Sequence, residues 1–455
     1  MALELRRPPM DMFHMPSLHE GMYYIPPRKG WVMRPAAGAT VRLFAGSDSD
    51  TINDLQELVI ERQQLQRFKA IMEINSAPVV LENAEFRNSF AMINGRFWLN
   101  GASGDRIRNK VDVQNNADWR KSRIKSAFRR ARNNGTLTPA LWKGKGNDLD
   151  IAIELKNGFN YYHFTTETLG SLAHFVKDKS GRPINLHLPQ DNIKGFLSRF
   201  ISAIYPSLAD RVNFVTSGTK YERVRSVYNH RHYLYQVRDP RIDDCVSVSD
   251  EPKWHELNSD NSYRKEVSKA SFDSSLRMLR EQALGQLSAD IIKGMPKLVF
   301  MGRDESGDAR ARGLVGHEPL LEELGSRGFE VVVFEHLSPL EQIAAMQAAD
   351  IVIAPHGAGL ANMTYSHPDS LVIEIGTRQT QMHRWGDFLA NAHVSGCHYD
   401  TVFADIAGVD DPDLVPPMAE GHLGVKIGKR ATDRILQIVD ERMAAISKPS
   451  VSRSV

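Results

Sequence analysis

The sequence contains little cysteine. Only Cys245 and Cys397 occur among its 455 residues, and neither belongs to a Cys-x-x-Cys pattern. This scarcity excludes a disulfide framework and a cysteine-based zinc site. A reducing compartment is the simplest expectation, and we therefore predict a cytoplasmic protein.

Long apolar runs are also missing. Residues 1–29 scatter prolines and charges and lack the apolar core of a signal peptide, so we interpret residues 1–40 as an extended arm. The longest apolar stretches, such as 297–301 and 351–354, have the length of a strand and not of a membrane span. Any membrane association is expected to be peripheral, at the inner membrane face.

The chain lacks a strong excess of either charge. Its 57 Lys and Arg residues against 55 Asp and Glu residues give a net charge of +2, and no nucleic-acid partner is expected. One local exception is the segment 120–132, which we predict to be a basic helix with a narrow apolar face. Its basic face is simply solvated, or it binds an anionic acceptor or a membrane surface.

The order of strand and helix patterns predicts an α/β protein, and the length suits two or three domains. Strands at 151–153, 183–188 and 211–215 with a helix at 160–177 form one α/β unit. A second unit begins with a strand at 297–301 and includes a helix opened by Ser338, where Glu341 completes a capping box. We also expect a β-hairpin that turns at Asn94-Gly95 and a helix at 51–72. The cluster Asp48-Ser49-Asp50 before that helix is interpreted as a cap in preference to a metal site.

A glycine turn at 355–363 is the most informative motif. Gly357 and Gly359 follow a buried strand, and such glycines let backbone N–H groups and a helix N-terminus approach an anion. Glu374, which we place at the end of the next strand, is where a Rossmann-like fold holds a carboxylate against ribose. The pairing predicts a nucleotide site, although close helix packing and a capping glutamate would explain it equally well. The binding candidates are His356, Gly357, Ala358, Gly359, Leu360, Asn362 and Glu374.

A second candidate cluster lies on the helix predicted at 160–177. At helical spacing His163 and Glu167 lie one turn apart, together with Asn160 on the same face. An imidazole beside a carboxylate is suited to removing a proton from a hydroxyl group. The alternative is an ordinary hydrogen bond on a helix surface. Asn160 and Tyr162 are accessory or acceptor-side candidates.

Arginines follow the first strand of the second unit. Arg303 lies at the carboxyl end of that strand, the edge of the sheet where ligands bind, and its guanidinium would neutralise a diphosphate. Arg310 and Arg312 come after an acidic stretch and are weaker, accessory candidates, because surface arginines beside acids usually form solvated ion pairs.

These motifs together resemble the family 61 glycosyltransferases, which include bacterial capsular-polysaccharide biosynthesis proteins. The resemblance rests on residues 160–164, Arg303, 338–342, 355–363 and 372–374, and spans roughly 78–402. It implies a GT-B-like fold, in which two Rossmann-like domains face each other across a cleft, with the N-terminal arm and the β-hairpin as additions. The domains are then the arm at 1–40, an acceptor-side domain at 41–290, a donor-binding domain at 291–446 and a disordered tail at 447–455.

The resemblance also implies inverting transfer from a nucleotide sugar to a hydroxyl of a glycan or polysaccharide. Glu167 or His163 would be the base, and Arg303 with the glycine turn would stabilise the leaving diphosphate, so no metal or other cofactor is expected. The sequence departs from the family pattern at Gly302, where serine is usual, and at 316–318. The alternatives are a nucleotide- or polyanion-binding protein without activity and an enzyme that modifies nucleotide sugars.

Overall fold

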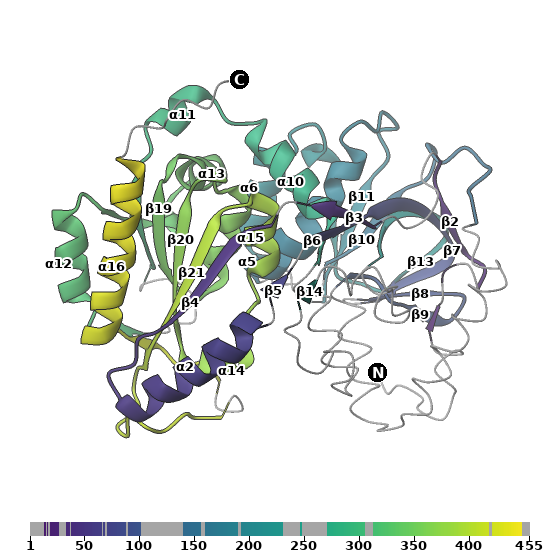
Figure 1. Ribbon diagram of the computed structural model, residues 1–455. Coiled ribbons are helices and arrows are strands. Elements are labelled where there is room, and N and C mark those ends of the chain that lie inside the picture. The colour runs from purple at the N-terminus through teal and green to yellow at the C-terminus, as the bar shows by residue number, and fades with distance from the viewer. Residues whose placement is uncertain are drawn as a thin grey trace, which may run out of the picture. The chain divides into compact units, whose positions relative to one another are not determined.

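The computed structural model describes residues 13–14, 16, 19–26, 33–36, 38–65, 67–68, 71–87, 90–101, 140–155, 160–189, 193–230, 246–247, 271–304, 313–417 and 421–447. The chain forms two compact units. Unit 1 comprises Met1–Ala36, Lys69–Val246 and Lys253–Gln286, and unit 2 comprises Ala37–Phe68, Ser247–Pro252 and Leu287–Val455. Each unit combines helices with a large sheet (Figure 1), which confirms the predicted α/β class. Within the described ranges, every helix is too short or too polar to cross a membrane.

Unit 2 is built on a mainly parallel sheet in the order β18-β16-β19-β20-β21, and β4 pairs in parallel with β21. Strands β17 and β22 extend this sheet beside the end of β21. The strands are β4 (Thr40–Ala45), β16 (Leu298–Gly302), β17 (Leu314–Val315), β18 (Glu330–Val333), β19 (Ile351–Pro355), β20 (Leu371–Thr377), β21 (His398–Ile406) and β22 (Val425–Lys426). The helices are α2 (Asp50–Leu65), α11 (Ala289–Lys293), α12 (Glu318–Ser326), η4 (Phe334–His336), α13 (Pro339–Ala348), η5 (Ala358–Tyr365), α14 (Arg378–His383), α15 (Leu389–Ser395) and α16 (Lys429–Ile446).

Both faces of this sheet are covered. Helices α12 and α16 lie side by side on one face (Figure 1), where Leu324 and Ile438 pack in one core with Ile353 and Ile373. Side chains alternate between the faces of a strand, and Val352, which follows Ile351 on the other face, is fully buried as well. The continuous apolar sequences of β19 and β20 are what a parallel strand buried on both faces requires.

The strand order reverses at β16. From β16 the chain passes through α12 to β18 on one side, and then through α13 to β19 on the other side of β16. Helix α13 begins at the predicted capping box: Ser338 Oγ accepts from the Glu341 amide at 3.3 Å, and Glu341 Oε2 accepts from the Ser338 amide at 2.7 Å. In doubly wound sheets, ligands bind beyond the carboxyl ends of the strands at such a reversal.

Unit 1 combines parallel and antiparallel strands in one sheet of order β1-β9-β8-β7-β13-β10-β11-β12, and β2 also pairs with β7. A separate sheet has the order β15-β6-β3. The strands are β1 (Phe13–His14), β2 (Met22–Tyr24), β3 (Met33–Ala36), β6 (Ile71–Ile74), β7 (Ser76–Arg87), β8 (Phe90–Ile93), β9 (Arg96–Trp98), β10 (Ile151–Glu154), β11 (Ile184–His187), β12 (Val212–Val215), β13 (Thr219–Asn229) and β15 (Ser271–Asp273). The helices are α5 (Tyr161–His163), η1 (Phe164–Thr168), η2 (Leu169–Phe175), α6 (Gly195–Ile204), η3 (Ala209–Arg211) and α10 (Ser274–Leu284). The remaining strands described are β5 (Arg67–Phe68), which belongs to unit 2, and its partner β14 (Val246–Ser247), at which the sequence range of unit 1 ends and a range of unit 2 begins.

The hairpin predicted at Asn94-Gly95 is present between β8 and β9. Both turn residues have positive φ, 48° at Asn94 and 73° at Gly95, as a tight two-residue hairpin turn requires. The expected arm at 1–40 contributes short strands, since β1 pairs with β9, β2 with β7 and β3 with β6.

One segment lies in a different unit from the one expected. The predicted bounds place residues 41–68 with the acceptor-side domain, whereas β4 joins the sheet of unit 2 through β21. Arg42 strengthens this pairing with a two-pronged ion pair to the buried Asp400, where Nε lies 3.0 Å from Oδ1. The pairing joins residues more than 350 positions apart, and no local pattern reports it.

The helix expected at 51–72 ends earlier, at Leu65, and β6 already occupies residues 71–74. Ser49 caps it, since the Ile52 amide donates to Ser49 Oγ at 3.2 Å. Asp48 caps a different helix: its carboxylate accepts from the amides of Lys429 at 3.0 Å and Arg430 at 2.8 Å, at the start of α16. Asp48 therefore acts as a cap, although of α16 and not of the helix that follows it in the sequence.

Candidate active site

The glycine turn begins where β19 ends, beside the reversal in strand order of unit 2. The helix that follows, η5, is a 3₁₀ helix whose first bond runs from the Leu360 amide to Gly357 O at 3.1 Å. Because this bond occupies Leu360, the amides available to an anion are those of the three preceding residues, Gly357, Ala358 and Gly359. The turn thus keeps the predicted form, but with Leu360 committed to the helix.

Arg303 directly follows β16 and reaches the turn. Its Nη2 donates to His356 O and lies 3.5 Å from Pro355 O. A Cβ atom on Gly357 would lie 2.4 Å from this same nitrogen, so the glycine makes room for the guanidinium. Burial lowers the pKa of Arg303, with Glu335 opposing the shift, but an arginine remains cationic. The structure therefore joins a permanent positive charge to the start of the turn.

Glu374 differs from the prediction. It lies in the middle of β20, not at its end, and pairs with Ala354 and Thr401 on the neighbouring strands. One carboxylate oxygen bonds His356 Nδ1; the other accepts from the hydroxyls of Tyr399 and, at 3.4 Å, of Thr401. The carboxylate is buried and engaged on both sides, so it supports His356 instead of facing a ribose.

Tyr399 extends this arrangement into β21. Burial, and then the negative charge of Glu374, hold the pKa of Tyr399 well above its usual range, so the phenol stays a hydrogen-bond donor. His356 in turn packs edge-on against Phe388, with ring centroids 5.4 Å apart. A histidine whose Nδ1 is fixed by a carboxylate has a defined ring orientation.

Asn362 belongs to the core. It is buried, and its Nδ2 lies 3.5 Å from Gln342 Oε1 on α13. Gln342 also donates to Leu337 O at 3.2 Å. Asn362 therefore ties η5 to α13, which differs from the predicted contact with a ligand.

In unit 1, His163 and Glu167 meet as their spacing predicts. His163 Nδ1 lies 2.9 Å from Glu167 Oε2, an ion-pair distance at an angle outside hydrogen-bond geometry. The helix is irregular: three α-helical residues, then a π-helical turn that carries Glu167, then a 3₁₀ segment. π-Helical turns are frequent at functional sites. Asn160 caps the start, its Oδ1 accepting from the His163 amide at 3.2 Å, and Tyr162 stands edge-on to His163 at 5.3 Å.

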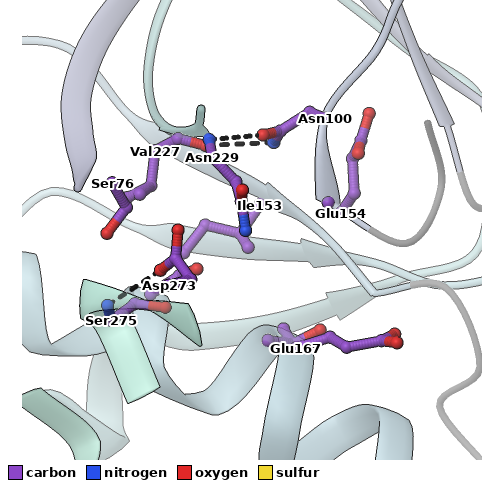
Figure 2. A pocket seen from close by; sticks show the side chains of 12 residues that line it. Ser76, Asn100, Ile153, Glu154, Glu167, Val227, Asn229, Asp273 and Ser275 are labelled. Atoms are coloured by element: carbon purple, nitrogen blue, oxygen red, sulfur yellow. Dashed lines mark hydrogen bonds between the residues drawn. The ribbon is translucent and has the colours of Figure 1, made fainter. Parts of the chain in front are cut away.

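Glu167 lines an open pocket within unit 1 (Figure 2). Two further carboxylates, Glu154 and Asp273, line the same pocket. Glu154 is the last residue of β10. Asp273 is the last residue of β15 and caps α10, because its Oδ1 accepts a hydrogen bond from the Ser275 amide at 2.8 Å. Sequence reasoning missed Glu154 and Asp273. An acid at the end of an apolar strand is a signal for Glu154, whereas the Ser-Phe-Asp sequence of β15 offers no such signal for Asp273.

Some predicted features lie outside the described residues. These are Arg310, Arg312, the basic segment 120–132 and the tail after residue 447. Within the ranges given above, the structure contains no group of three or more His, Cys, Asp or Glu residues suited to holding a metal ion.

Comparison with known proteins identifies the family of the central region. Residues 161–373, just under half of the chain, match the family model Glycosyltransferase 61, which confirms the resemblance seen in the motifs. The β-1,2-xylosyltransferase RCN11 of Oryza sativa subsp. japonica is 34% identical over 70 residues, which are 15% of this chain and 13% of that protein. The chain thus matches only a small part of that relative's length. The family region contains Glu167, Arg303 and the glycine turn, and ends just before Glu374.

Proposed function

We propose that this glycosyltransferase 61 protein moves a sugar from a nucleotide-sugar donor to a hydroxyl of a glycan, with inversion at the anomeric carbon. The single observation that carries the proposal is the contact of Arg303 with the glycine turn at the strand-order reversal of unit 2. It combines a fixed cation with helix-terminal amides, which suits a diphosphate that gains charge as it leaves. The family match supports transfer of a sugar as the class of reaction.

In the proposed reaction Glu167 removes the proton from the acceptor hydroxyl. Glu167 lines the pocket of unit 1, and His163 Nδ1 lies 2.9 Å from its Oε2, within ion-pair distance. The acceptor oxygen forms a bond to the anomeric carbon while the bond from that carbon to the diphosphate oxygen breaks, and the diphosphate keeps the electron pair. Arg303 and the amides of Gly357, Ala358 and Gly359 then stabilise the departing charge.

His356 completes the donor side of the proposal. Glu374 and Tyr399 fix its ring, so the imidazole would meet the phosphate or the sugar in one orientation. Because the chain supplies its own positive charge, the proposal requires no metal. It also requires the two units to close around both substrates, which is the GT-B arrangement, with the acceptor in unit 1 and the donor in unit 2.

The variant Arg303→Ala tests the donor site. We expect kcat/KM for the nucleotide sugar to fall by about 10²–10³-fold, because one preorganised cation at a developing charge contributes roughly that much. Steady-state kinetics would measure the loss, and calorimetric titration with nucleoside diphosphates would show weaker binding. Arg223, whose pair with Glu82 lies at the surface, gives the matched control Arg223→Ala, which should keep its activity.

Full activity of Arg303→Ala at an unchanged melting temperature would remove Arg303 from the mechanism. Glu167→Gln separates the base from the donor site, since it should abolish transfer while diphosphate binding stays intact. A wild-type protein that binds nucleotides but neither hydrolyses nor transfers any nucleotide sugar would contradict the proposed function as a whole.

A further inference from the structure

The pocket of unit 1 has a composition that indicates its ligand. It lies beyond the carboxyl ends of the parallel strands β10 and β13 and of β15, the edge where α/β sheets bind ligands. Nine of its twelve lining residues are polar, and hydroxyl, amide and carboxylate groups contribute, including Ser76 and Asn229. A polar pocket of this kind suits a ligand covered with hydroxyl groups more than an apolar one.

The wall of the pocket is already fixed by bonds within unit 1. Asn100 joins the chain after β9 to the end of β13: its Oδ1 accepts from the Asn229 amide at 2.7 Å and its Nδ2 donates to Val227 O at 3.0 Å (Figure 2). Gly170 lets the helix of Glu167 pack directly on α10, because a Cβ atom there would lie 2.4 Å from Ser275 O. The pocket is therefore preformed, with Glu167 held at a set distance from α10.

The charge of the lining is one-sided. Glu154, Glu167 and Asp273 contribute carboxylates, and none of the twelve lining residues is lysine or arginine. Ionised carboxylates accept strong hydrogen bonds from hydroxyl groups, whereas a carboxylate or phosphate on the ligand would meet charge of its own sign.

We propose that this pocket binds the acceptor through an uncharged sugar residue, with Glu154 and Asp273 accepting hydrogen bonds from its hydroxyls beside the base Glu167. The proposal rests on the proposed function and deepens it. Glu154 and Asp273 determine specificity: they admit neutral sugars and reject uronic acids and phosphorylated sugars.

The variants Glu154→Gln and Asp273→Asn test this assignment. Both keep the shape of the side chain, and asparagine caps a helix as well as aspartate does, so α10 keeps its N-terminal cap. We expect the KM for a neutral acceptor, such as a methyl glycoside, to rise about tenfold in each, while donor KM and donor hydrolysis stay unchanged. Glu281→Gln, on the exposed side of α10, is the matched control and should change nothing.

A panel of neutral methyl glycosides and the corresponding methyl uronides supplies the second readout. The wild type should use and bind the neutral sugars at least about tenfold better, and Glu154→Gln should narrow this difference. Transfer with an unchanged acceptor KM in both variants, or equal use of uronides, overturns the inference and leaves the transferase intact. Ligand-observed NMR gives a further outcome. If the wild type binds neutral sugars, the variants do not, and no turnover occurs, the transferase function is overturned and the assignment of the pocket stands. If the wild type shows neither turnover nor sugar binding, both the transferase function and the assignment of the pocket are overturned.

Discussion

Gly357 is a glycine because a cation needs its space. Its φ of 172° is open to any residue, so backbone freedom does not explain it. The reason is the guanidinium of Arg303, which lies where a side chain would begin. The position of Arg303 therefore explains why residue 357 has no side chain.

The variant Gly357→Ala should therefore act through Arg303. Its Cβ would push Nη2 off His356 O, and we expect activity to fall by about 10²-fold with little change in melting temperature, because the displaced group is the end of a flexible side chain. Kinetics of the single and double variants would show the coupling: adding Gly357→Ala to Arg303→Ala should cost little more. Gly325, in an open position on α12, gives the control Gly325→Ala. Losses that simply multiply in the double variant would show that the two residues act independently.

At the scale of elements, α16 depends on a cap from far away in the sequence. Asp48, in the loop between β4 and α2, supplies the carboxylate that binds the first amides of α16. Gly428 leaves room for it, since a Cβ atom there would lie 2.1 Å from Asp48 Oδ2. The same contact holds the loop between β4 and α2 to the start of α16.

The variant Gly428→Ala should break this cap and lower the free energy of unfolding of unit 2 by about 1–2 kcal/mol. Asp48→Ala should cost a similar amount for the same reason. Urea unfolding of both single variants and the double variant gives the test. If the cap is their shared mechanism, the double variant is hardly less stable than either single one; full additivity would refute it.

Elements with strong local signals could be predicted, and those defined by distant partners could not. The apolar run of β19, the capping box of α13 and the Asn94-Gly95 turn each specify their structure within a few residues. Strand β13 was missed, because its first half carries three exposed charged residues, Lys220, Glu222 and Arg223. Its identity comes from pairing with β7, which lies more than 100 residues earlier.

The candidate site divides in the same way. The spacing of His163 and Glu167 fixes their contact within a single helix turn, and strand-end positions bring Arg303 to the glycine turn. The environment of Glu374 depends on Tyr399 of another strand, and that partner has no signature near Glu374. A buried carboxylate in an apolar strand predicts only that some partner exists.

At the scale of the whole molecule, buried histidines make stability depend on pH. Burial lowers the pKa of His14 and of His187 to about 4 each. Both lie in unit 1, and in the unfolded chain a histidine titrates near 6.5. As the pH falls from 6.5 to 4, the unfolded chain takes up protons that the folded unit refuses, so the free energy of unfolding decreases.

We expect the free energy of unfolding of unit 1 to fall by up to about 3 kcal/mol per histidine across this interval. Above pH 7 these histidines should cause no such dependence on pH. Urea unfolding at a series of pH values measures it. In His187→Gln the slope between pH 6 and 5 should be smaller by about 1.4 kcal/mol per pH unit. An unchanged slope would contradict the assignment to His187. Asp178 affects the free energy of unfolding only below about pH 4. Burial raises the pKa of its carboxyl group, but hydrogen bonds from Arg225, Ser180 and Arg211 outweigh the effect of burial, so the pKa is lowered.

The pairing of β4 with β21 also has a consequence for synthesis of the chain. A ribosome completes residues 37–68 well before residue 287, where the main part of unit 2 begins, and it adds roughly 5–20 residues per second. For tens of seconds β4 and the apolar residues of α2 are present without the sheet that will cover them. Nascent chains are therefore most exposed to aggregation or chaperone capture in this interval, and unit 2 becomes complete only when α16 leaves the ribosome.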